Sequence, residues 1–176
     1  VELDAGFLNL PDLFEAQVIK SPDATALVFG DQNLTYLELE HASNRLAHYL
    51  IDQGVGSEQV VAILLDRCPE MIIGMLAVLK AGAAYLPLDP EYPADRLAYM
   101  LVDSGARLVL STAARLEDLE ARLSPADQIS IEALRLIDVA DQDFNASLRV
   151  GDHLAPTNLT RLGALHPQHL AYLIYT

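Results

Sequence analysis

The histidines of this chain are the first residues to consider for chemistry, because imidazole groups bind metals and transfer protons near neutral pH. His41 and His48 are seven residues apart and would lie on one face of a helix, but no cysteine or carboxylate completes a metal-binding set with them. His166 and His169 are three residues apart, and Pro167 between them breaks the helical spacing. We therefore expect these four histidines to be exposed to solvent and to bind no metal.

A lysine and a cysteine are the chain's other candidates for catalysis. Lys80 lies near the expected C-terminus of a helix, where a positive charge is stabilised by the helix dipole and the exposed carbonyl groups. Cys68 is the only cysteine, so it can form no intramolecular disulfide, which fits a reducing compartment. Because Cys68 lies between the apolar residues 64–65 and the start of a helix, we expect it to have a packing role.

The sequence G-V-G at residues 54–56 superficially resembles the start of a dinucleotide-binding fingerprint. It precedes an expected strand instead of following one, and Gln59 occupies the position of the third glycine. We therefore interpret Gly54 as the end of a helix that is followed by a turn.

Composition and charge exclude several classes of protein. The 176 residues are 52% apolar, which is typical of one globular domain or one large subdomain. The 11 basic and 25 acidic residues give a net charge of −14 without a basic cluster, so we expect no binding to nucleic acid. No apolar run reaches the ~18 residues of a membrane span, and the acidic start at residues 1–4 does not resemble a signal peptide. We expect a cytoplasmic location with no membrane partner, and we expect the acidic residues Glu117, Asp118 and Glu120 to face solvent.

Helix start and stop signals divide the first third of the chain into elements. A proline begins an expected helix over 11–20, and a short apolar run predicts a strand over 24–29. Thr35 and Glu38 have the spacing of a capping box, in which the threonine hydroxyl group accepts from the glutamate amide group and the glutamate side chain bonds back. The sequence therefore predicts a helix over 36–53.

An alternation of buried strands and helices follows, and it determines the expected fold class. Apolar runs predict strands over 60–65, 84–88 and 107–110, with helices over 69–81 and 93–104 between them. This order implies an α/β fold with a mostly parallel sheet, right-handed crossovers and helices on both faces. Because the helix over 69–81 is apolar on nearly every side, we expect it to be buried.

The final third of the chain has weaker signals. A helix is expected over 113–123. The pattern weakens over 124–166, where a strand is expected over 134–139 and residues 140–166 are interpreted as mostly loop. Residues 169–175 predict a strand that is buried on both faces, because residues 170–175 alternate little between apolar and polar side chains. We expect this strand to belong to the same parallel sheet.

Three segments resemble motifs of one enzyme superfamily. Residues 34–39 match L-[ST]-Y-x-E-L, and residues 79–89 resemble a motif that begins L-K-A-G-x-A-Y-L and ends P-[LI]-D. Residues 170–176 match the opening of L-A-Y-x-x-Y-T-S-G-[ST]-T-G-x-P-K-G. Together they indicate that the region from about Leu10 to Thr176 is similar to the adenylation domains of nonribosomal peptide synthetases, which are adenylate-forming enzymes.

The resemblance implies an activity for the parent domain. An amino acid and ATP would react to aminoacyl-AMP and pyrophosphate, with Mg²⁺ on the phosphates, and the acyl group would pass to phosphopantetheine on a neighbouring carrier domain. Thr176 is the one residue that the resemblance assigns to ATP binding, since it begins the Thr-Ser-Gly loop around the phosphates. No catalytic residue is carried over, because the family's catalytic lysine lies in a C-terminal domain and Lys80 is not its equivalent. Residues 1–10 would be a linker or lead-in, and 11–176 an incomplete N-terminal part of the domain.

The expected partners follow from the same resemblance. They are the remainder of the adenylation domain, the carrier and condensation domains, and the amino-acid substrate. Because the motif breaks off after Thr176, we expect this chain alone to bind no cofactor and to be inactive. We also expect residues 169–175 to leave an apolar surface, through which the chain associates with itself or with the remainder of the domain. An acyl-CoA or fatty-acyl-AMP ligase of the same fold is one alternative, and a non-catalytic scaffold or interaction module is another.

Overall fold

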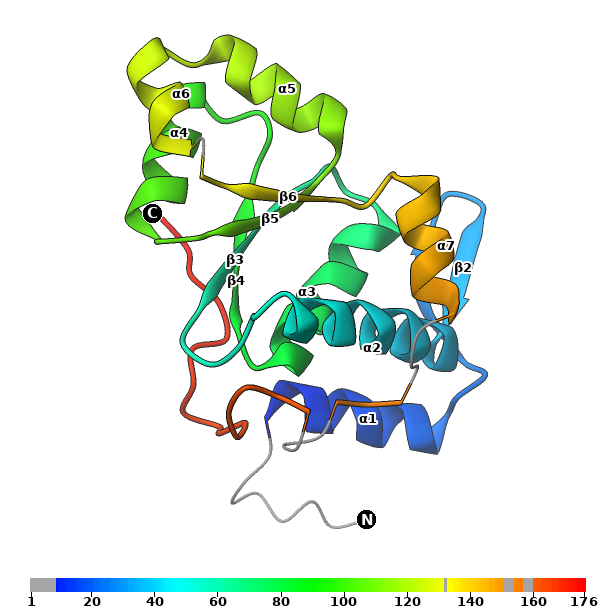
Figure 1. Cartoon of the computed structure of the whole chain (residues 1–176). Helices are drawn as coiled ribbons and strands as arrows, with labels where there is room; N and C mark the ends of the chain where they lie inside the picture. Colours follow the sequence, from blue (N-terminus) through cyan, green and yellow to red (C-terminus); the bar gives the residue numbers. More distant parts are fainter. Residues whose placement is uncertain (1–8, 132, 151–153, 157–159) are drawn as a thin grey trace.

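A four-stranded parallel sheet lies at the centre of the computed structural model (Figure 1). Its strands are β3 (Val60–Leu64), β4 (Ala84–Leu88), β5 (Leu108–Ser111) and β6 (Arg135–Asp138), and their spatial order is β4-β3-β5-β6. The predicted parallel sheet is confirmed, with β3 between two neighbouring strands.

The structure describes most of the chain, namely residues 9–131, 133–150, 154–156 and 160–176. Residues 1–8 of the predicted lead-in lie outside this description. Among the described residues, no helix combines the length and the apolar character needed to cross a membrane.

Strand β3 is buried on both faces, as its continuous apolar sequence predicts. Val61 and Ile63 contact the core on one side of the sheet, whereas Ala62 and Leu64 contact the core on the other. None of these four residues is more than 1% exposed. A polar residue at any of these positions would lose its hydration without gaining a partner.

Helices cover both faces of the sheet (Figure 1). α2 (Tyr36–Asp52) and α3 (Pro69–Ala81) pack on the face that includes Ile63. α4 (Ala94–Asp103), α5 (Ala113–Arg122) and α6 (Pro125–Ile131) lie on the opposite face. This arrangement confirms the predicted layers of helix, sheet and helix.

Helix α3 approaches the sheet closely through Gly74. A Cβ atom at this position would lie 2.9 Å from Cδ1 of Leu110 on β5, so the glycine allows the contact. The predicted complete burial of α3 is only partly correct, because its apolar residues 71–73 and 75–76 are half-buried. Gly82 ends the helix with a φ of 92°, in the left-handed region that favours glycine.

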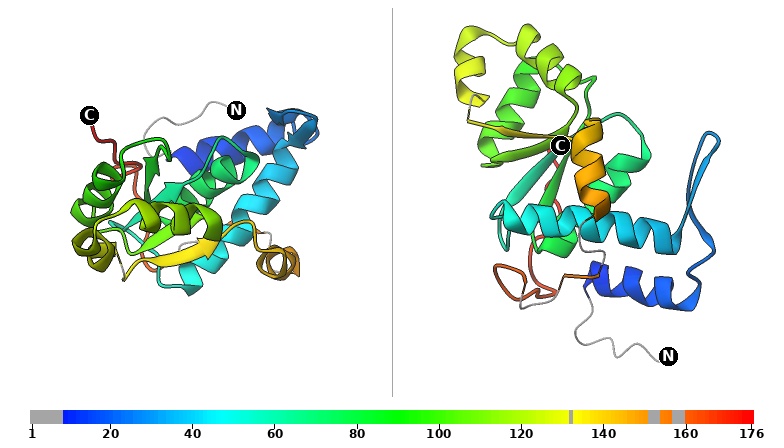
Figure 2. Two further views of the ribbon diagram at one scale, coloured as in Figure 1. Left: turned by 90° about the horizontal axis from the view of Figure 1, so that it is seen from above. Right: turned by 45° about the vertical axis from the view of Figure 1, so that its right-hand side comes forward.

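Two elements lie outside the central layers. α1 (Leu10–Lys20) lies beside α2, and β1 (Thr25–Phe29) pairs with β2 (Gln32–Thr35) as an antiparallel hairpin. Figure 2 shows this hairpin beyond one end of α2, apart from the four-stranded sheet. The sequence predicted β1 but not β2, because the alternation of apolar residues in β2 is short and interrupted by polar side chains.

The region after α5 contains two helices that the sequence did not predict, and the second of them lies in the range interpreted as loop. In α6, the Ser124 hydroxyl group accepts a hydrogen bond from the Asp127 amide group at 3.3 Å and donates one to its carboxylate at 2.6 Å. In α7 (Gln142–Val150), the Asp141 carboxylate accepts from the Phe144 amide group at 3.1 Å. Both caps are local signals, and the shortness of the helices conceals their periodicity.

The predicted strand over 169–175 is wrong as a strand, although the segment does lie beside the sheet. A single parallel bridge joins Tyr172 to Tyr85 on the outer edge of β4. Alternate residues of a parallel strand direct their backbone groups to the same side, so the next outward position after Tyr85 is Pro87. Proline has no backbone N–H group, and the ladder therefore cannot continue at this position.

A capping box begins α2, as predicted. Thr35 Oγ1 accepts a hydrogen bond from the Glu38 amide group at 3.2 Å, and the Glu38 carboxylate accepts one from the Thr35 amide group at 2.8 Å. Hydrogen bonds from the backbone and side chain of Thr35 lower the pKa of the Glu38 carboxyl group. The contribution of Glu38 to stability is therefore present above its unfolded-state pKa and is lost as the pH falls through the lower folded-state pKa.

Thr35→Ala should lower the free energy of unfolding by about 1 kcal/mol at neutral pH, because a helix amide group loses its acceptor. Thr35→Ser keeps the acceptor and should retain most of that stability. The difference between Thr35→Ala and the original chain should shrink as the pH falls through the lowered pKa of Glu38, because protonation removes the negative charge that accepts from Thr35. Urea unfolding at pH 7 and pH 3 measures both effects, and an alanine variant as stable as the original chain at pH 7 would show that the cap is misassigned.

Candidate functional site

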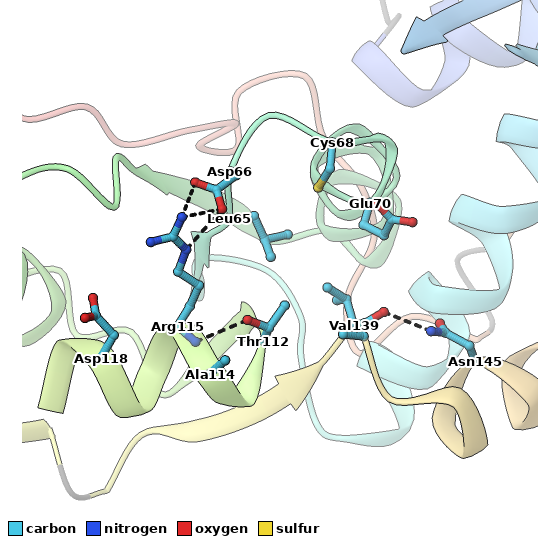
Figure 3. A pocket seen from close by; sticks show the side chains of 11 residues that line it. Leu65, Asp66, Cys68, Glu70, Thr112, Ala114, Arg115, Asp118, Val139 and Asn145 are labelled. Carbon is cyan, nitrogen blue, oxygen red and sulfur yellow. Dashed lines mark hydrogen bonds and ion pairs between the residues drawn. The ribbon is translucent and has the colours of Figure 1, made fainter. Parts of the chain in front are cut away.

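The order of the strands creates a topological switch between β3 and β5. The chain leaves β3 to form β4 on one side and then returns to form β5 on the other. Ligands of open parallel sheets commonly bind at such a point, outside the carboxyl ends of the strands. A hollow of about 760 Å³ lies there, lined by Leu65 and Asp66 after β3 and by Thr112 and Arg115 after β5 (Figure 3).

The charges of this hollow do not suit a phosphate group. The Arg115 guanidinium group donates hydrogen bonds to the Asp66 carboxylate at 3.0 and 2.6 Å, so its positive charge is already paired. These hydrogen bonds raise the pKa of Arg115. Glu70 and Asp118 line the same hollow and make its net charge negative (Figure 3). In the part of the chain that the structure describes, no cluster of three His, Cys, Asp or Glu side chains could hold a metal ion.

Cys68 lies at this hollow, immediately before α3. Its side chain packs partly buried against the core, and burial raises the pKa of the thiol group. A raised pKa keeps the thiol protonated, whereas a nucleophilic cysteine requires a lowered one. The predicted packing role of Cys68 is confirmed.

A second candidate place is the segment of residues 169–176, on the outer edge of β4. The Tyr85 amide group donates to the Ala171 carbonyl group at 3.1 Å, and the Leu173 amide group donates to the Tyr85 carbonyl group at 3.0 Å. The segment therefore runs parallel to β4, toward the edge of the sheet where the strands have their carboxyl ends. Thr176 is the last residue of this segment.

Residues of this segment alternate between covered and exposed positions. Leu173 and Tyr175 are partly buried against the core on the α4 side of the sheet. Leu170, Tyr172 and Ile174 are 46%, 49% and 61% exposed, and we call them the apolar edge row. The sequence predicted burial on both faces, whereas the structure covers only one.

Lys80 lies in the last turn of α3, as predicted, but its side chain is buried and does not bond to the carbonyl groups at the helix end. Its ammonium group donates to the Glu40 carboxylate and to Asn44 Oδ1, each at 2.6 Å, and to the Ser43 hydroxyl group at 2.9 Å. Burial lowers the pKa of Lys80, and the Glu40 carboxylate opposes that shift. The carbonyl group of Lys80 accepts instead from Arg161 Nε at 2.6 Å. Lys80 thus connects α3 to α2, which assigns it a structural role.

The remaining candidates have ordinary structural roles. His41, His48 and His169 are half-buried, so the predicted solvent exposure of the histidines is confirmed for His166 alone. His48 Nε2 lies 3.0 Å from the carbonyl oxygen of Leu154, and the rings of His166 and His169 meet edge to face at 5.1 Å.

Two further expectations are confirmed. Gly54 follows the end of α2 with a φ of 88°, as a helix end and turn require. The acidic residues Glu117, Asp118 and Glu120 lie exposed on α5.

Lys80→Met should lower the free energy of unfolding by about 3–5 kcal/mol, because it leaves the Glu40 charge buried without its partner. Replacing Glu40 by methionine as well should restore much of that stability, since a well-packed apolar pair can substitute for a buried ion pair. Lys20→Met on exposed α1 is the matched control and should change stability by less than about 0.5 kcal/mol. Urea unfolding measures all three variants, and equal small losses for Lys80→Met and Lys20→Met would contradict the buried network.

Comparison with known proteins identifies the family. The family described as AMP-binding enzyme matches residues 14–176. Tyrocidine synthase 3 of Brevibacillus parabrevis is 46% identical over 169 residues, which are 96% of this chain and 2% of that protein. The chain therefore spans only a small part of this relative.

Solved structures agree with the sequence relatives. The AMPPNP-bound form of the nonribosomal peptide synthetase FmoA3 has a TM-score of 0.79 at 29% identity, over 99% of this chain and 17% of that chain. Its α-methyl-L-serine-AMP-bound form has a TM-score of 0.78 at 26% identity, over 99% of this chain and 18% of that chain. The N-terminal subdomain of Klebsiella oxytoca NpsA, in complex with 3-hydroxybenzoyl-AMSN, has a TM-score of 0.66 at 25% identity, over 86% of this chain and 34% of that chain.

These similarities confirm the predicted fold class and the predicted resemblance to nonribosomal peptide synthetases. The family match covers nearly all of the sequence, including the segment that ends at Thr176. The chain belongs to the AMP-binding enzyme family.

Proposed function

We propose that this chain is the N-terminal part of an adenylation domain of a nonribosomal peptide synthetase. The observation that carries the proposal is the parallel course of residues 169–176 along β4, inside the region that the AMP-binding family matches. The relative FmoA3 binds AMPPNP in one structure and α-methyl-L-serine-AMP in another, which supports the activation of an amino acid with ATP.

The proposed reaction joins an amino-acid carboxylate to the α-phosphorus of ATP. The carboxylate oxygen attacks this phosphorus, the bond to the bridging oxygen breaks, and pyrophosphate leaves. Mg²⁺ would neutralise the phosphate charges, and the acyl group would then pass to phosphopantetheine on a carrier domain. The part of this chain is to bind and orient, since β4 holds the segment that leads to the phosphates.

Thr176 is the residue to which we assign phosphate binding. It ends the segment that runs parallel to β4, and its hydroxyl and backbone amide groups are hydrogen-bond donors that an anion can accept from. The alternative position, the hollow between β3 and β5, has a paired arginine and three carboxylates. The phosphates would be repelled there, which supports their placement at Thr176 instead.

The division of the chain and its partners belong to the same proposal. Residues 1–10 form a lead-in, and residues 11–176 are the first part of the domain. The match to the N-terminal subdomain of NpsA covers 34% of that chain, which supports residues 11–176 as a part of such a subdomain. We propose that the remainder of the domain packs against the apolar edge row, because an exposed row of apolar side chains at a sheet edge is unusual. Carrier and condensation domains are the further partners, and the cytoplasm is the proposed location.

The complete adenylation domain that contains this chain should catalyse the exchange of pyrophosphate into ATP, dependent on an amino acid. The 176-residue chain alone should stay at background, because the loss of even one preorganised donor commonly costs about 10²–10³-fold in rate. In the complete domain, Thr176→Val should lower kcat by about 10²-fold. Thr25→Val, an exposed position on β1, is the matched control and should be as active as the original domain.

Three results would contradict the proposal. Exchange above background by the 176-residue chain alone would overturn the assignment of the reaction to the complete domain. Thr176→Val with unchanged kcat would remove the assigned phosphate contact. A complete domain that forms acyl-AMP only with fatty acids would show a fatty-acyl-AMP ligase.

A further inference from the structure

The Tyr175 hydroxyl group donates a hydrogen bond to the Asp103 carboxylate at 2.6 Å. Asp103 is the last residue of α4, so the bond joins the segment of residues 169–176 to a helix that packs on the sheet. A hydroxyl group that donates to a carboxylate forms one of the stronger hydrogen bonds in proteins, and the short distance is typical of this class.

The surroundings of Tyr175 hold its ring in place. Tyr99, one turn earlier on α4, meets the ring edge to face, with ring centres 6.1 Å apart and an interplanar angle of 80°. The ring also packs partly buried against the core. Burial, together with the nearby Asp103 carboxylate, raises the pKa of Tyr175 to about 12, so the hydroxyl group stays protonated and donates at every working pH.

The backbone offers no comparable anchor at this end of the segment. The parallel bridge lies at Tyr172, and Pro87 cannot donate the next ladder hydrogen bond to the segment. Beyond the end of the backbone pairing, the side chain of Tyr175 connects the segment to α4. Because Tyr175 directly precedes Thr176, its anchor determines where the next residue lies.

We propose that Tyr175 and Asp103 form a positioning pair that orients Thr176 toward the ATP phosphates. The proposal rests on the proposed function, since it assumes that Thr176 contacts these phosphates. Neither residue is a catalytic residue. Their effect passes through the backbone to the phosphate-binding position, where a misplacement of about 1 Å can cost up to about 10²-fold in rate.

The test uses the complete adenylation domain and measures kcat and KM for ATP and for the amino acid by pyrophosphate exchange. Tyr175→Phe and Asp103→Ala should each lower kcat/KM for ATP by about tenfold, as expected for the loss of one charge-assisted hydrogen bond. KM for the amino acid should remain unchanged. Asp103→Asn keeps an acceptor for the hydroxyl group and should restore most of the activity that Asp103→Ala loses.

The double variant Tyr175→Phe with Asp103→Ala should be no worse than either single variant, because both remove the same bond. Asp95→Ala, an exposed aspartate in the first turn of the same helix, is the matched control and should retain the original kcat and KM. If Tyr175→Phe fails to fold, the comparison of Asp103→Asn with Asp103→Ala decides the question.

Two outcomes would overturn the positioning pair. One is that Tyr175→Phe and Asp103→Ala both have the same kcat/KM for ATP as the domain without substitutions. The other is a loss of thermal stability together with equal changes in KM for ATP and KM for the amino acid, which a purely structural role would cause. If the domain without substitutions has no exchange activity, the proposed function itself is contradicted. Failure of the proposed function and failure of the positioning pair are therefore distinguishable.

Discussion

The burial of β3 on both faces is the constraint on which the rest of the structure depends. A strand without a solvent face must be apolar along its length and must have a strand on each side, and β4 and β5 fill these positions. Parallel neighbours require crossovers, and the crossover helices cover both faces. The same geometry places the carboxyl ends of the strands at one edge, toward which residues 169–176 also run.

Elements that depend on local signals could be predicted from the sequence. The Thr35 cap, the end of α3 at Gly82 and the central strands all follow from residues close together in the chain. The network around Lys80 could not be predicted, because Glu40 lies 40 residues away and only the packing of α2 on α3 brings the two together. The spacing of Glu40, Ser43 and Asn44 by three and four residues marks one face of α2, but a polar helix face ordinarily indicates solvent.

The candidate site, too, could be predicted from the sequence only in part. Thr176 was identified through a motif, and the structure adds the direction from which the chain reaches it. The pairing of Arg115 with Asp66, 49 residues apart, neutralises the arginine beside the topological switch, and nothing in the local sequence indicates this pair. Hydrophobicity alone predicted a strand over 169–175, whereas Pro87 on the neighbouring strand limits its pairing to one bridge. Local composition cannot reveal such a restriction on a partner strand.

The central claim is that the nucleotide phosphates bind at the end of residues 169–176 and not in the hollow between β3 and β5. A crystal structure of the complete adenylation domain with a non-hydrolysable ATP analogue tests it directly. We expect a phosphate oxygen within hydrogen-bond distance of Thr176, with Arg115 still paired to Asp66. Phosphates bound beside Arg115, with Thr176 turned away from them, would contradict the assignment of phosphate binding to Thr176.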